Sequence, residues 1–170
     1  MENFLNINIF RTFISGTPLM KVFRKTLLLL VILTVVFQFV QPTKNKSEGI
    51  SSDDISKVYA MDEELHGMLV TKCYDCHSNN TKYPWYFNVQ PIGWWLAAHV
   101  HDGKEHLNFS AFGSYSAEKA EHKLEELKEV MEDHSMPLKS YVLFHPETEV
   151  TDADIDRVSA WLRSIGAIDE

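Results

Sequence analysis

The chain has 170 residues, of which 45% are hydrophobic and 24% are charged, a composition typical of a folded protein that argues against disorder. The length allows one domain, with little room for a second core. The net charge of −8 is uneven, because residues 1–40 hold four basic and one acidic side chain (+3) while residues 41–170 hold 12 and 23 (−11). So acidic a domain lacks the basic surface of a nucleic-acid-binding protein, and we expect no nucleic-acid partner.

The first 40 residues contain an apolar run, residues 27–40, that follows three basic residues between positions 21 and 25. This order is typical of a secretory signal or a membrane anchor. A helix over residues 22–40 would be ~28 Å long, close to the ~30 Å hydrocarbon core of a bilayer. Small residues at an A-x-A cleavage site are missing, which favours an uncleaved anchor. The basic residues orient the N-terminus to the cytoplasm, so we expect a single-pass inner-membrane anchor with the rest of the chain in the periplasm.

The sequence divides into three predicted parts. Residues 1–40 form a cytoplasmic extension plus the anchor, or alternatively a cleaved signal, and Met20 is an alternative start to Met1. Residues 41–54 are polar and contain a proline and a glycine, which is typical of a tether. Residues 55–170 are then the folded domain.

The domain opens with apolar residues at three- and four-residue steps over about 54–76, which predict a first helix whose last turn carries both cysteines. Polar turn residues and two prolines predict a loop over 78–91. A second helix is predicted from Ile92 to about His106, with Trp94 and Trp95 on its buried side.

Two further helices close the chain. Ser116 is a favourable N-cap for a third helix, which carries an apolar stripe over four turns. Thr151 and Asp154 form a capping-box-like pair before the last helix, which stops at Gly166. No alternating strand pattern and no internal repeat are present in the sequence. The predicted fold class is therefore all-α, with four short helices.

Both cysteines lie in one motif, Cys73-Tyr74-Asp75-Cys76-His77. Cys-x-x-Cys-His is the attachment pattern of c-type haem. Two thiols three residues apart near a helix end can each form a thioether with one vinyl group, and the following imidazole is then directed at one axial face of the iron. We therefore predict one covalently attached haem c, held by Cys73 and Cys76 and ligated by His77.

Other interpretations explain the motif less well. A thioredoxin-like redox pair needs a preceding strand, whereas an apolar helical pattern precedes this motif. A structural zinc site needs four ligands, and no second Cys/His pair at suitable spacing is obvious. A disulfide between Cys73 and Cys76 would close too short a loop to stabilise the fold much, and it leaves His77 unexplained.

Met136 is the predicted distal ligand of the iron. It lies in a non-helical segment well downstream of the motif, and pairing a thioether with histidine raises the reduction potential. Pro137 fixes the chain beside it. His99 and His106 are seven residues apart on one helix face and are the competing ligands, and an open iron is a further alternative. Together with His101 they form an alternative metal site without haem.

Aromatic residues and prolines supply candidates for the rest of the pocket. Trp94 and Trp95 are predicted to contribute to a porphyrin pocket, although each aromatic side chain also suits an ordinary core. A proximal histidine donates its free ring N–H to a carbonyl. Pro84 and Pro91 lie where a loop carbonyl could accept it from His77, and we favour Pro91.

Several separated segments together resemble the bacterial haem-binding domain family: CYDCHSNNTKYPWY, then PIGWWL, the spacing from His99 to LNFS, HKLEE and MPL. They fall in order over about residues 55–166, and the first 40 residues lie outside the resemblance. This family consists of small c-type cytochrome modules, some of them linked to dihaem cytochrome c peroxidases. The resemblance implies a cytochrome c-like helical fold, with covalent haem c on Cys73 and Cys76 and with His77 as the proximal ligand.

We expect a membrane-tethered periplasmic cytochrome that carries single electrons, rather than an enzyme, because an iron with two protein ligands has no open position for substrate. Its expected partners are membrane redox proteins or a periplasmic electron acceptor or peroxidase, and its acidic surface favours a basic docking patch. Two alternatives keep the distal ligand displaceable: a peroxidase-type haem domain and a haem-based redox or gas sensor.

Overall fold

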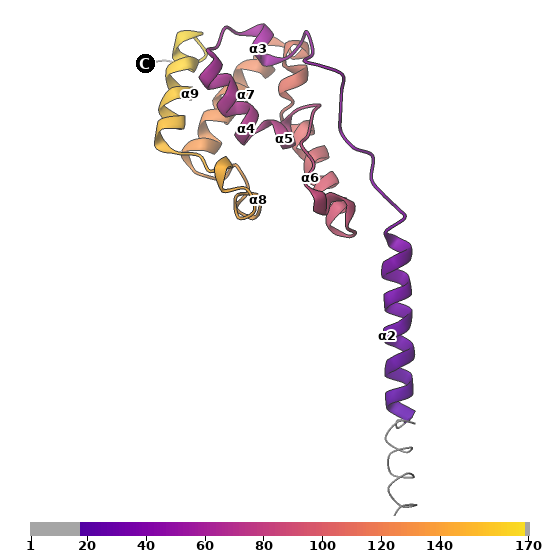
Figure 1. Cartoon of the computed structure of the whole chain (residues 1–170). Coiled ribbons are helices and arrows are strands. Elements are labelled where there is room, and N and C mark those ends of the chain that lie inside the picture. The colour runs from indigo at the N-terminus through magenta and orange to yellow at the C-terminus, as the bar shows by residue number, and fades with distance from the viewer. Residues whose placement is uncertain (1–17, 169–170) are drawn as a thin grey trace, which may run out of the picture.

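The computed structural model describes residues 18–168, and every regular element in that range is a helix (Figure 1). The α-helices are α2 (Pro18–Phe37), α3 (Ile55–Val58), α4 (Glu63–Lys72), α5 (Tyr74–His77), α6 (Ile92–His106), α7 (Ala117–Glu132), α8 (Lys139–Val142) and α9 (Asp152–Ser164). The 3-10 turns are η1 (Trp85–Asn88), η2 (Phe109–Ser114) and η3 (Pro146–Thr148). The predicted all-α fold class is confirmed for the described residues.

Helix α2 projects away from the folded domain, and none of its side chains is buried (Figure 1). It ends at Phe37, and the next side chain, Gln38, bonds to the domain instead of continuing the helix: Oε1 accepts the backbone N–H of Gln90 at 2.9 Å. No helix among residues 18–168 combines the length and the apolar character that crossing a membrane requires. Most of the predicted cytoplasmic extension, residues 1–17, lies outside the described residues.

The segment predicted to be a tether, residues 41–54, is bonded to the domain along part of its length. The side-chain amide of Asn45 donates to the carbonyl of Ser78 at 2.7 Å and to the hydroxyl of Thr81 at 2.9 Å. Its Oδ1 accepts a hydrogen bond from Nζ of Lys104 at 2.6 Å. Polar composition indicates an irregular segment correctly, but here those polar groups hold the segment against the domain.

The prediction of one helix over residues 54–76 is wrong, because the chain forms three short helices there. Asp54 caps α3 by accepting the N–H two residues on at 3.0 Å, and Asp62 caps α4 by accepting the N–H three residues on at 2.7 Å. Cys73 ends α4 with φ −125° and ψ −37°, and α5 begins after it. Each Asp side chain caps the N-terminus of a new helix. The spacing of the apolar residues continues across the breaks between these helices, so the spacing alone does not show where one helix ends and the next begins.

The other three predicted helices are confirmed. Helix α6 has the predicted bounds, Ile92–His106. Ser116 caps α7 by accepting the N–H three residues on at 3.3 Å, and Thr151 with Asp154 forms the reciprocal capping box of α9. The chain leaves α9 through Gly166, whose φ of +71° suits glycine. Helix α8 and the 3-10 turns are too short for a sequence period to predict.

The hydrophobic core lies among α4, α7, α9 and η2. Its most buried members are Leu65 and Leu69 of α4, Phe109 and Phe112 of η2, Leu124 of α7 and Val158 and Leu162 of α9. Nε1 of Trp161 donates to the carbonyl of Ala60 at 3.0 Å, which ties α9 to the segment before α4. This core holds in place α4, which leads into the cysteine motif, and α7, which leads toward Met136.

Candidate functional site

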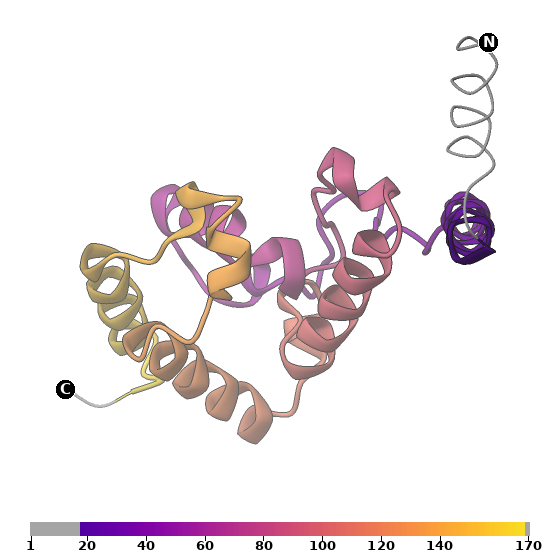
Figure 2. The ribbon, with the colours of Figure 1, turned by 90° about the horizontal axis from the view of Figure 1, so that it is seen from below.

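A cavity of about 580 Å³ is lined by residues of α5, α6, α7 and α8 and of the segments beside them. Figure 2 shows how these helices are arranged. Cofactor and small-molecule sites commonly have volumes of roughly 300–1,000 Å³. The cavity wall includes four of the predicted site residues, Cys73, Cys76, His77 and Met136. Much of the remaining wall is apolar, including Leu107, Phe109, Leu127, Val130, Met131, Leu138 and Val150. The fold therefore brings the motif and the predicted distal ligand to one apolar space.

Cys73 and Cys76 are free thiols on this wall. Burial raises the pKa of the Cys73 thiol to about 12 and that of the Cys76 thiol to about 11. Both thiols are therefore protonated near neutral pH, whereas a dithiol redox centre depends on a thiolate with a lowered pKa. Two protonated, unpaired sulfurs beside an apolar cavity suit thioether attachment better than disulfide exchange.

His77 is oriented by a backbone carbonyl. Its Nδ1 lies 3.0 Å from the oxygen of Leu107, and because a carbonyl only accepts, Nδ1 carries the proton and Nε2 keeps a free lone pair. Burial lowers the pKa of His77, which favours the neutral form that binds metals. The prediction that Pro91 accepts this proton is wrong: Pro91 lies at the opposite end of α6 from Leu107, and its carbonyl accepts the N–H of Trp95.

Met136 lies on the cavity wall in the segment between α7 and α8. Its backbone N–H donates to the carbonyl of Val130 at 3.2 Å, so the segment is held against the last turn of α7. The residue is 38% exposed. Its thioether is therefore positioned beside the cavity without being enclosed by the core.

His99 and His106, the competing ligands, also lie on the cavity wall. Nδ1 of each lies 2.8 Å from the carbonyl four residues before it, so Nε2 of each keeps its lone pair. His101 instead faces Glu105 at 3.4 Å, and both of these side chains are exposed. Between residues 18 and 168, no group of three or more His, Cys, Asp or Glu side chains is placed to hold a metal ion, which disfavours the three-histidine site.

Trp94 and Trp95 are placed away from the cavity wall, contrary to the prediction. Nε1 of Trp94 donates to the carbonyl of Val40 at 2.8 Å, and its ring meets that of Phe37 edge-on at 5.6 Å. Trp95 is half exposed, and its ring lies 4.2 Å from that of His99. Helix α6 meets the cavity only with its C-terminal part, because its N-terminal part packs against the end of α2.

Two residues that the motifs do not reveal, Tyr141 and Gly103, complete the site. The hydroxyl of Tyr141 in α8 donates to Oδ2 of Asp75 in α5 at 2.7 Å. Gly103 lets α6 approach α5, since a Cβ there would lie 2.8 Å from the carbonyl oxygen of Cys76. A glycine inside a helix destabilises it by about 0.5–1 kcal/mol relative to alanine, which indicates that close packing requires the glycine. Gly103, within the predicted second helix, is the one sequence signal for this contact.

These residues fit haem c: two thiols for the vinyl groups, an imidazole with a free Nε2 and a thioether border one apolar cavity. A family model described as a haem-binding domain matches residues 32–164. The match begins inside α2, which corrects the expectation that the first 40 residues lie wholly outside the resemblance. The contacts of Gln38 and Val40 with the domain agree with this earlier start. No curated protein and no solved structure matches the chain.

Proposed function

The chain belongs to the haem-binding domain family, and we propose that it is a monohaem c-type cytochrome that carries single electrons. In this proposal Cys73 and Cys76 hold one haem c through thioethers, and His77 and Met136 are its axial ligands. The observation that carries the proposal is that all four side chains border the same cavity of about 580 Å³. The bound haem would supply one-electron chemistry at its iron.

The chain's own contacts prepare the site for this role. The Leu107 carbonyl holds the ring of His77 in one tautomer with Nε2 available. The bond between Tyr141 and Asp75 ties α8 to α5 across the site. The buried core on α4 and α7 supports the elements on either side of the cavity. A site held in this way changes little between two oxidation states, which suits electron transfer rather than substrate turnover.

We also propose that the protein is held at the inner membrane through residues 22–40, with the domain in the periplasm. The support is the exposed apolar surface of α2, which follows basic residues at positions 21, 24 and 25. The proposed partners are membrane redox proteins or a periplasmic electron acceptor or peroxidase. The charge of −11 on residues 41–170 favours a basic docking patch on such a partner, so the association rate should fall as salt rises.

Covalent attachment tests the proposal most directly. The full chain is produced in cells that attach haem c, and a pyridine haemochrome spectrum is combined with haem staining after denaturing electrophoresis. One covalent haem per chain is expected in the wild type, and none in the double variant Cys73→Ser, Cys76→Ser. Haem that leaves the wild-type chain on denaturation would contradict the proposal.

The distal ligand is tested on the same protein. Thioether ligation gives oxidised haem c a weak charge-transfer band at the red end of the spectrum, and Met136→Ala should abolish it while lowering the reduction potential. His99→Ala and His106→Ala are matched controls from the same cavity wall and should keep the band. A band that survives Met136→Ala would show that another residue ligates the iron.

A second candidate function is a haem domain with a displaceable distal ligand, either peroxidase-type or sensory. The partial exposure of Met136, which the core does not enclose, favours it. Rapid carbon monoxide binding to the reduced protein would support this candidate, as would peroxide consumption that is absent in the double cysteine variant. A reduced form that binds carbon monoxide only slowly supports the closed electron carrier.

A further inference from the structure

The large exposed apolar side chains of the domain gather mainly at one end. They come from two segments, residues 84–95 and 136–144. We call the following residues the apolar face: Trp85, Val89, Ile92, Trp95, Leu143 and Phe144. Trp85, Leu143 and Phe144 are 79%, 75% and 69% exposed. The ring of Tyr86 joins the two segments, since its centroid lies 5.8 Å from that of Trp85 and 6.0 Å from that of Phe144.

The apolar face is also nearly free of charge. Residues 84–95 contain no Asp, Glu, Lys or Arg, and residues 136–144 contain only Lys139. The rest of the domain is strongly acidic, so its negative charge is displaced from this end. A soluble protein rarely exposes a contiguous apolar patch unless something binds there.

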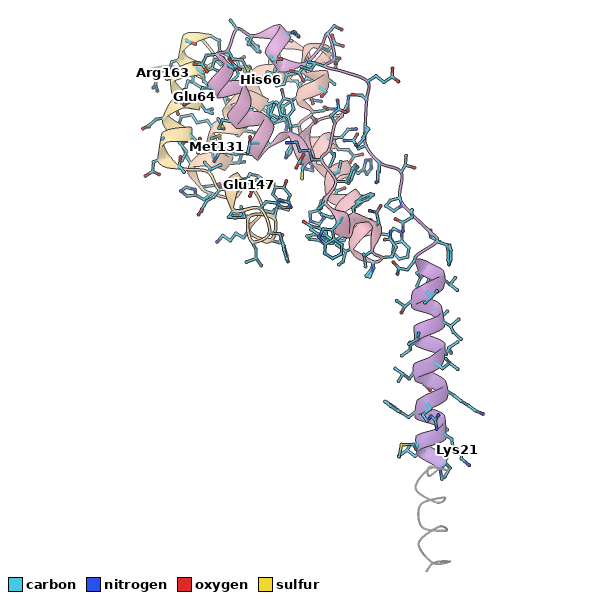
Figure 3. All side chains as sticks on the ribbon, viewed as in Figure 1. Lys21, Glu64, His66, Met131, Glu147 and Arg163 are labelled. Carbon is cyan, nitrogen blue, oxygen red and sulfur yellow. The ribbon has the colours of Figure 1, made fainter. Side chains whose placement is uncertain are left out.

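The position of α2 indicates what covers the face. Figure 2 looks along the axis of α2, so that axis is vertical in Figure 1, where α8 and the turn from η1 into α6 are the lowest parts of the domain. They lie level with the C-terminal end of α2, and their side chains project downward in Figure 3. The contacts of Trp94 with Phe37 and Val40 fix that end of α2 beside the face. A plane perpendicular to the axis of α2 at its C-terminal end therefore meets both segments of the apolar face, residues 84–95 and 136–144.

We propose that the apolar face rests on the surface of a lipid bilayer. This inference rests on the membrane association proposed above and adds the orientation of the domain. Tryptophan and tyrosine favour the boundary between lipid and water, and a bilayer attracts an apolar, weakly basic surface more readily than an acidic one. A bilayer into which the apolar residues 27–37 of α2 insert would also meet the apolar face at its surface.

The orientation has a consequence for the haem site. Met136 and Leu138 belong both to the segment that carries part of the apolar face and to the wall of the cavity. The α8 side of the cavity is then turned toward the lipid, and the distal ligand lies close to the membrane surface. Electron exchange is thereby directed to a redox partner embedded in the same membrane.

Photolabelling of the full-length holoprotein tests this orientation. The protein is reconstituted into vesicles of phosphatidylcholine and phosphatidylglycerol that contain a phospholipid with a diazirine near its headgroup, and labelled peptides are identified by mass spectrometry. Label is expected in α2 and in the peptides covering residues 84–95 and 139–145. Peptides around Ile50 and Val58, which are exposed apolar residues away from the face, should remain unlabelled.

Matched variants complete the test. The double variant Trp85→Gln, Phe144→Gln should lose most of the label on the face while α2 stays labelled, and Val58→Gln should change neither. Label confined to α2 in the wild type would overturn the orientation and leave the face to a protein partner or a second copy. Absence of label from α2 as well would instead refute the membrane association itself.

Discussion

The hydroxyl of Tyr141 donates a hydrogen bond of 2.7 Å to Oδ2 of Asp75, which directly precedes Cys76 in the cysteine motif. Burial, followed by the bond and the charge of Asp75, raises the pKa of Tyr141, so it remains a neutral donor at physiological pH. Helix α8 has no buried residue of its own. Its position over the cavity therefore depends on this bond, together with the bond of 2.9 Å between Tyr86 and His145 just after α8.

Replacing Tyr141 with Phe should loosen α8 without removing an axial ligand. Loss of this bond weakens the closed state by about 1 kcal/mol, which corresponds to roughly fivefold more frequent opening. Carbon monoxide should bind the reduced variant about fivefold faster, since opening of α8 moves the segment that carries Met136. Tyr115→Phe is the matched control, because its hydroxyl bonds to the backbone of Asn108, away from α8. Equal binding rates in wild type and Tyr141→Phe would show that α8 is held by other contacts.

Gly103 and Gly67 form a second matched pair, because both lie inside helices. A methyl group at Gly103 would lie 2.8 Å from the carbonyl oxygen of Cys76, so Gly103→Ala must push α6 away from α5 at a cost of about 1–3 kcal/mol. Nothing lies within 4 Å of a Cβ at Gly67, so Gly67→Ala should stabilise α4 by about 0.5–1 kcal/mol. Urea unfolding and the yield of covalent haem measure both effects. Full haem attachment in Gly103→Ala would contradict the close approach.

Helices with both an N-capping residue and apolar residues at helical spacing could be predicted from the sequence. Helix α7 has Ser116 as its cap and a stripe of apolar residues, and α9 has its capping box, so local physics determines where they begin. The attachment chemistry, which requires a fixed local spacing and a soft ligand, also predicts one site for the cysteine motif and Met136, and these residues border the same cavity.

Contacts between separate elements could not be predicted in the same way. The carbonyl that accepts from His77 belongs to Leu107, thirty residues downstream, and it is in reach only because α6 packs closely on α5. The period of α6 likewise does not show that Trp94 packs against Phe37 and the end of α2 rather than in the pocket. Polarity alone also does not distinguish a free tether from a segment held by Asn45.

Asn45 should prove a structural residue rather than a part of a flexible linker. Its side chain makes bonds to Ser78, Thr81 and Lys104, so Asn45→Ala leaves several polar groups without partners and should cost about 1–3 kcal/mol. Hydrogen–deuterium exchange of residues 41–50 should rise sharply. Lys46→Ala, at the neighbouring exposed position, is the control and should leave exchange unchanged. Identical exchange in Asn45→Ala and wild type would restore the interpretation of a free tether.

Asp154 should make the free energy of unfolding of the domain depend on pH in the acidic range. Partial burial alone would raise the pKa of its carboxyl, but bonds from the backbone and hydroxyl of Thr151 and the ammonium of Lys72 at 3.0 Å outweigh burial and lower it below the ordinary 3.8. Because the pKa of Asp154 is lower in the folded state, its ionised carboxylate stabilises the native state fully at pH values above the unfolded-state pKa. This contribution is lost as the pH falls through the folded-state pKa. Asp154→Asn should therefore lower the free energy of unfolding by about 1–2 kcal/mol at neutral pH, measured by urea unfolding. The difference from wild type should shrink as pH falls below about 4.

Asp152→Asn, in the same first turn, is the control, because no side-chain bond within residues 18–168 ties Asp152 to α4. A difference for Asp154→Asn that stays constant down to the acid transition would show that the charge of Asp154 contributes nothing and that only its capping geometry matters.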